Sequence, residues 1–108
     1  HQSWFTDEAN AVLNNYCAGR VVADPTPFPV DKSTSSSVAF RYFRLHGSPQ
    51  MYYSSYASEY LEELAVRLRE EQSHGRTCWC IFDNTALGAA TSDALAVKSR
   101  LSESERAI

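Results

Sequence analysis

Short apolar runs alternate with amphipathic segments along this chain, and that alternation constrains the fold more than any other feature. The runs cover residues 20–24, 38–45 and 77–82 and are rich in β-branched and aromatic side chains. Strands that are apolar on both faces are typical of a parallel sheet covered by helices. The sequence therefore predicts the α/β class, with parallel strands and flanking helices in the order helix, strand, loop, strand, helix, strand, helix.

The helical segments carry recognisable end signals. The first helix is expected to begin at the N-cap Thr6 and to close at Gly19, because glycine most easily adopts the left-handed conformation that follows a helix. The second runs from about 58 to 72, with Ser58 as its cap and Gly75 just beyond its end. The last helix, roughly 89 to 101, presents one apolar side formed by Ala90, Ala94, Val97 and Leu101.

The connection between the first two strands is predicted to be a structured loop. Residues 25–37 hold three prolines and a Ser/Thr-rich end, which exclude a regular helix. The segment is just long enough to carry the chain back across a sheet, and the parallel arrangement of the first two strands depends on it.

Composition argues against several classes of protein. A hydrophobic content of 44% is enough for a packed core, and the formal net charge of −3 argues against a general nucleic-acid binder, which needs an excess of Lys and Arg. No apolar run approaches the roughly 18 residues of a membrane-spanning helix. Neither a membrane segment nor a signal peptide is recognised, so a cytoplasmic protein is expected.

The cysteines are interpreted as buried thiols. Cys78 and Cys80 alternate along the third strand and should share one of its faces. Together with His74 they could be taken for part of a zinc site, but this spacing on a strand suits two tetrahedral ligands poorly and a fourth ligand is missing. No metal site is predicted, and no cofactor can be assigned.

Polar side chains able to do chemistry follow each predicted strand. They are Asp24 after the first strand, Arg44 and His46 at the end of the second, and Asp83 with Asn84 after the third. Because ligands bind at the carboxyl edge of parallel sheets and barrels, these groups form the candidate site. The alternative is structural: Asp24 precedes a proline and could start a turn, and Asp83 with Asn84 could cap one.

Four motifs, in order, resemble those of the YecE-like domain of unknown function. The segment from Tyr42 to Gly47 resembles a Tyr-x-Arg-x-His-Gly signature, and His1 to Phe5 is similar to a segment that follows one of the family's central strands. The tyrosine-containing loop at 53–56 and the following helix are also similar to the family. The fourth similarity lies in the C-terminal part of the chain and comprises Phe82-Asp83-Asn84-Thr85, Gly88-Ala89 and Ala94.

The resemblance implies a TIM-like barrel in a protein more than twice this length. On that basis residues 1–108 are the C-terminal part of the domain, a fragment from which the N-terminal part of the barrel is absent. Three strands cannot close a cylinder, so the chain is expected to pair with the missing part of the barrel or with a second copy. The resemblance implies no particular reaction.

Two functional interpretations remain open. In the first, an enzyme binds a small anionic ligand of the sugar or phosphate type: Arg44 anchors the anion and His46 acts as acid or base. Asp24, Asp83 or Asn84 then orients His46 or holds a metal. Additional candidates for ligand contact are His1, Asp24, Tyr56 and Asn84. In the second, the same groups form a structural network in a non-catalytic binding or interaction module; an inactive truncated copy is a further alternative.

Overall fold

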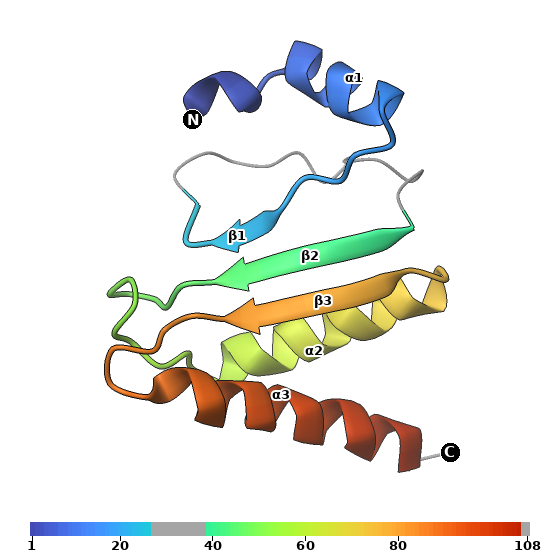
Figure 1. Ribbon diagram of the computed structural model, residues 1–108. Helices are drawn as coiled ribbons and strands as arrows, with labels where there is room; N and C mark the ends of the chain where they lie inside the picture. Colours follow the sequence, from blue (N-terminus) through green and yellow to red (C-terminus); the bar gives the residue numbers. More distant parts are fainter. Residues whose placement is uncertain (27–38, 107–108) are drawn as a thin grey trace.

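The computed structural model describes residues 1–26 and 39–106 of the 108-residue chain. The elements in order are η1 (Gln2–Trp4), α1 (Asp7–Asn15), β1 (Val22–Asp24), β2 (Phe40–Leu45), α2 (Ser58–Ser73), β3 (Thr77–Phe82) and α3 (Ala89–Arg106) (Figure 1). Most of the predicted loop at 25–37, with Val38, lies outside the described residues.

The three strands form one parallel sheet in the order β1-β2-β3, which confirms the predicted α/β class. The register pairs Val22 with Phe43 and Phe43 with Cys80. The ladder continues past the strand ends, because the His46 N–H donates to the Asp24 carbonyl at 2.7 Å and the Asp83 N–H donates to the Leu45 carbonyl at 3.0 Å. The carboxyl ends of all three strands therefore meet at one edge of the sheet.

The core lies between β2, β3 and the helices α2 and α3, which pack on one face of the sheet (Figure 1). Phe43 and Leu45 alternate along β2, each is 1% exposed, and both face the helices. The helical side of this core is formed by Leu61, Leu64 and Leu68 of α2 and Val97 of α3. The periods of two and of 3.6 residues seen in the sequence bring these side chains together.

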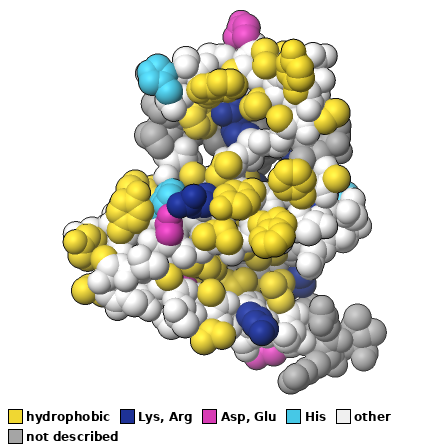
Figure 2. All heavy atoms as spheres, in the orientation of Figure 1, with side chains coloured by type: hydrophobic (Ala, Val, Ile, Leu, Met, Phe, Trp, Pro, Cys, Tyr) yellow, Lys and Arg dark blue, Asp and Glu magenta, His cyan; other side chains and the backbone are white. Residues whose placement is uncertain are grey.

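The opposite face of the sheet is not covered by α2 or α3. It carries the alternate side chains of the strands, and Phe40, Trp79 and Ile81 are 48%, 60% and 37% exposed. Figure 2 shows hydrophobic side chains gathered over this part of the surface, with basic, acidic and His side chains together beside them. Over residues 1–26 and 39–106 the sheet is therefore open on this face, which is consistent with part of a barrel.

Two predictions about where the helices begin and end differ from the structure. Thr6 caps α1 as expected, since its side chain accepts from the Ala9 N–H at 3.1 Å. The predicted closing residue Gly19 is wrong: the left-handed position is taken by Cys17, with φ of 53°, because the helix ends at Asn15. The N–H groups of Cys17 and Ala18 donate back to the Asn14 and Leu13 carbonyls, which terminates the helix four residues before Gly19.

Helix α2 begins without a side-chain cap. Ala57 is the N-cap residue, so the prediction of Ser58 as the cap is wrong; the Ser58 hydroxyl instead accepts from Arg100 of α3 at 2.8 Å. Gly75 follows the helix with φ of 79°, as predicted. The Ser58 side chain thus links α2 to α3.

The buried side of α3 differs from the predicted stripe. Ala90 and Val97 are buried, but Ala94 is exposed, and the position between them is taken by Asp93, which is 3% exposed. Asp93 can be buried there because three polar groups donate hydrogen bonds to its carboxylate.

Cys78 and Cys80 share one face of β3, as predicted, and this face lies toward the helices. Both are free thiols, and they are half-buried rather than buried as expected. They line a cavity of about 190 Å³ together with side chains of α2 and α3. Burial, with a smaller contribution from Cys78, raises the pKa of Cys80 to about 11. Cys80 is therefore a poor nucleophile at neutral pH.

Candidate functional site

Arg44, His46 and Asp83 meet at the carboxyl edge of the sheet, on its open face. Arg44 lies in register with Ile81, and His46 and Asp83 each follow by two residues, so all three point to the same side. The Arg44 Nη2 donates to Asp83 Oδ2 at 2.6 Å. The His46 Nδ1 lies 2.7 Å from Asp83 Oδ1 and 2.8 Å from Oδ2. One carboxylate therefore joins the guanidinium and the imidazole.

The three side chains remain accessible to solvent. Their exposed fractions are 42% for Arg44, 18% for His46 and 21% for Asp83. Burial acts to raise the pKa of Asp83, but hydrogen bonds and charge interactions with Arg44 and His46 outweigh it, and the pKa lies below the usual carboxyl range. The hydrogen bond and the charge of Asp83 in turn raise the pKa of Arg44.

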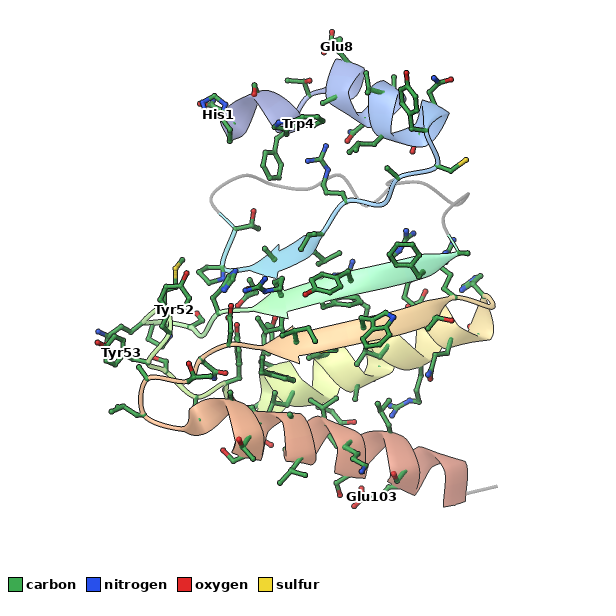
Figure 3. The ribbon with its side chains drawn as sticks, in the orientation of Figure 1. His1, Trp4, Glu8, Tyr52, Tyr53 and Glu103 are labelled. Carbon is green, nitrogen blue, oxygen red and sulfur yellow. The ribbon has the colours of Figure 1, made fainter. Side chains whose placement is uncertain are left out.

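The bond to Asp83 assigns a tautomer to His46. A carboxylate only accepts hydrogen bonds, so the proton between the two groups belongs to Nδ1 and Nε2 is left with its lone pair in the neutral ring. Tyr52 packs against this ring edge-on, with ring centroids 5.6 Å apart. Figure 3 places Tyr52 and Tyr53 on the loop beside the carboxyl ends of the strands. The site thus has an oriented imidazole next to a cation and an aromatic ring.

Asp24 and Tyr56 lie at the same edge of the sheet but on its helix-covered face. Asp24 is in register with Leu45, so its side chain points toward α2 and α3. The Tyr56 hydroxyl donates to Asp24 Oδ2 at 2.9 Å and accepts from the Gly47 N–H at 2.9 Å. Burial, together with Asp24, raises the pKa of Tyr56. These two candidates therefore belong to a partly buried network behind the exposed site.

Asn84 belongs to the same buried side and is 0% exposed. Its side-chain amide donates to the Ser54 carbonyl at 2.9 Å and to Asp93 Oδ2 at 2.8 Å. Asp93 also accepts from the Ser55 hydroxyl at 2.8 Å and from the Tyr56 N–H at 3.0 Å. Asp93 was not among the residues singled out from the sequence. Its position three residues after Ala90 and four before Val97, on the apolar side of a helix, is the signal that could have found it.

His1 lies apart from the three-residue cluster. Its imidazole is exposed, and its hydrogen bonds within the described chain go to Ser3. Figure 3 places His1 on the N-terminal segment, at the end of the molecule where the strands finish. The structure brings together Arg44, His46 and Asp83, but not His1.

The geometry permits acid–base chemistry and anion binding. A carboxylate that holds Nδ1–H leaves Nε2 to take or give a proton, and the neighbouring guanidinium can bind an anion. The Nε atom of Arg44 is buried and has no hydrogen-bond partner among the described residues.

Over residues 1–26 and 39–106, no group of three or more His, Cys, Asp or Glu side chains is placed to hold a metal ion. No helix in the same part of the chain is long and apolar enough to cross a membrane.

An open parallel sheet with helices on one face and a polar cluster at its carboxyl edge defines an α/β protein of the partial-barrel type. The family described as "Protein of unknown function DUF72" matches residues 1–108, and the chain belongs to this family. This is the YecE-like family, so the resemblance seen in the motifs is confirmed.

Two solved structures are similar to the chain. A DUF72 family protein from Thermotoga maritima is 28% identical, with a TM-score of 0.79 over 94% of this chain and 44% of that one. A DUF72 family protein from Enterococcus faecalis is 18% identical, with a TM-score of 0.73 and the same coverage, and shows similarity of fold. The chain thus spans less than half the length of these relatives. The search of curated proteins finds no match.

Proposed function

We propose that the cluster of Arg44, His46 and Asp83 binds a small anionic ligand of the sugar or phosphate type at the carboxyl edge of the sheet. The observation that carries the proposal is the convergence of a guanidinium and an imidazole on one carboxylate, on an accessible face. Arg44 provides the positive charge, and Asp83 orients the ring of His46. The Nε2 atom of His46 acts as acid or base toward the bound ligand.

The exposure of Arg44 supports this role for the guanidinium. A structural arginine in a folded core is held by several acceptors, whereas Asp83 engages a single terminal nitrogen of Arg44. With 42% of the side chain exposed, the guanidinium can be reached from solvent. An anion bound there gains a charge-assisted hydrogen bond without displacing Asp83 from His46.

A non-catalytic network is the second candidate, and one observation favours it. Asp83 bonds to both basic groups, so the three side chains largely satisfy one another without a ligand. In that case Arg44 and His46 fix the edge of the sheet in a binding or interaction module. The two candidates differ in whether an anion binds at Arg44.

Titration of the full-length protein with inorganic phosphate and with a hexose phosphate, followed by calorimetry, tests the proposal. Replacing Arg44 by Ala removes a hydrogen bond to a charged group, so we expect affinity to fall about tenfold to a hundredfold. Arg100→Ala is the matched control, because Arg100 pairs with Glu62 on the helical layer. Equal affinity of the wild type and Arg44→Ala, or no binding to the wild type, would support the structural network instead. Mass spectrometry and metal analysis of the purified protein identify a ligand that co-purifies.

The open face of the sheet is proposed to be covered, either by the remainder of a barrel or by a second copy of the chain. Its support is the exposure of Phe40, Trp79 and Ile81, side chains that are usually withdrawn from water. Sedimentation of the isolated 108-residue chain tests self-association.

The cytoplasm is the proposed compartment, because all three cysteines are free thiols, as is usual where the environment is reducing.

A further inference from the structure

Asp93 is a buried carboxylate on α3 that takes no direct part in the exposed cluster. It is 3% exposed and accepts three hydrogen bonds, from Ser55, Tyr56 and Asn84. Within the described chain, no Lys, Arg or His side chain forms an ion pair with it. Burying a carboxylate costs free energy unless its oxygens accept hydrogen bonds. The folded state is therefore stable only while the three donors stay within hydrogen-bond distance of Asp93.

The partners of Asp93 are directly connected to the proposed site. Asn84 is the next residue after Asp83. Tyr56 belongs to the loop that begins at His46 and Gly47, and its hydroxyl accepts the Gly47 N–H at 2.9 Å. Asp93 therefore ties the segment that carries Asp83 to the segment that carries His46.

These two segments approach each other closely at this point. A Cβ atom built on Gly47 would lie 3.1 Å from the Cβ of Asn84 and 2.9 Å from the Ser54 carbonyl oxygen. The last bond of the sheet ladder here runs from the Asp83 N–H to the Leu45 carbonyl. Beyond it, one backbone bond joins the two segments, from the Ala86 N–H to the Tyr52 carbonyl at 3.0 Å. The Ser55 hydroxyl, the Tyr56 N–H and the Asn84 amide add bonds that converge on Asp93.

From this we infer that Asp93 is a positioning residue that holds His46 against Asp83 from the opposite face of the sheet. The inference rests on the proposed function for its significance, because positioning matters only if the imidazole acts on a ligand. Asp93 itself lies behind the sheet and does not contact the exposed cluster. It acts through Asn84 on one side and through Ser55 and Tyr56 on the other.

The test reads the imidazole of His46 by ¹⁵N NMR on the full-length protein labelled at histidine, without any ligand. In Asp93→Asn the Ser55 hydroxyl can turn to accept from the amide, but the bonds from the Tyr56 N–H and the Asn84 amide then go to a neutral oxygen in place of a charged one. Hydrogen bonds to a neutral acceptor are weaker, so the two segments are held less tightly. We expect the ratio of the Nδ1–H to the Nε2–H tautomer of His46 to fall about two- to tenfold, the loss that one hydrogen bond supports. Asp83→Ala provides the reference for complete loss of the Nδ1 acceptor.

Two comparisons separate positioning from general stability. Val97→Ala removes a buried side chain from the same helix one turn further on and is expected to lower the melting temperature without changing the tautomer ratio. Ser92→Ala alters an exposed hydroxyl beside Asp93 and should change neither. If Asp93→Asn does not fold, Ser55→Ala, which removes one donor to Asp93, should give an intermediate fall in the ratio.

A wild-type tautomer ratio in Asp93→Asn, or in Ser55→Ala where Asp93→Asn does not fold, would overturn the inference and leave Asp93 a structural residue. The failure of the proposed function is visible separately. Absence of phosphate and hexose phosphate binding to the wild type refutes that function but leaves the tautomer measurement, which uses no ligand, as it is.

Discussion

Replacing Gly47 by Ala should destabilise the protein more than the same change at the other glycines with positive φ. Gly47 has φ of 101°, and a Cβ there would lie 2.9 Å from the Ser54 carbonyl oxygen, 3.1 Å from the Asn84 Cβ and 3.2 Å from the Gln50 carbonyl oxygen. Two of these atoms are backbone and the third is fixed by a buried side chain, so none can move aside cheaply. The left-handed backbone costs about 1–2 kcal/mol for a residue with a side chain, and the overpacking adds about 1–3 kcal/mol. The total is about 2–5 kcal/mol of lost unfolding free energy.

Gly75 and Gly88 supply the matched controls. Their φ angles are 79° and 80°, and a Cβ at either would meet nothing within 4 Å. Alanine there should cost the backbone contribution alone, about 1–2 kcal/mol. Urea denaturation of the three variants of the full-length protein measures the difference. Equal destabilisation of Gly47→Ala and Gly75→Ala would refute the argument that the chain is crowded beside His46.

Two further predictions concern the cluster and the open face. Arg44 and His46 hold the pKa of Asp83 below its usual range, so the stability that Asp83 contributes is present above the usual carboxyl pKa and is lost as pH falls through the lowered value. The difference in unfolding free energy between the wild type and Asp83→Asn should therefore shrink from about pH 4 downward, as measured by urea denaturation at each pH. Sedimentation of the isolated 108-residue chain should show self-association that Trp79→Lys weakens, because Trp79 is 60% exposed on the open face; a monomer that unfolds cooperatively would count against this.

The course of the sheet could be predicted from the sequence because local patterns determine it. Residues 77–82 form the third strand as expected, and the alternation along β2 correctly separates Phe43 and Leu45 from Arg44. The carboxyl edge was predicted because parallel strands must end together. These features follow from the period of two and from the neighbouring helices.

The sequence does not show which polar residues at the carboxyl edge lie on the open face of the sheet and which lie on the helix-covered face. Asp24 and Arg44 lie at the same edge, but the register that places Asp24 beside Leu45 is a property of the paired strands. The end of α1 at Asn15 depends on Cys17 accepting a left-handed conformation that the presence of Gly19 made unexpected. Asp93 could not be identified from the sequence, because its role depends on hydrogen bonds from three partners that lie 9 to 38 residues away in the chain.

The alternation of side chains at the end of β3 assigns two consecutive residues to different tasks. Asp83 faces solvent beside Arg44, whereas Asn84 is completely enclosed and bonded to Asp93. A saturation mutagenesis screen would therefore separate these neighbours by phenotype: substitutions of Asn84 should reduce the amount of folded protein in the cell, while substitutions of Asp83 should leave much of it intact and alter what it binds. Evolution can thus change the chemistry at this edge through Asp83, while the fold requires the adjacent residue Asn84 to stay the same.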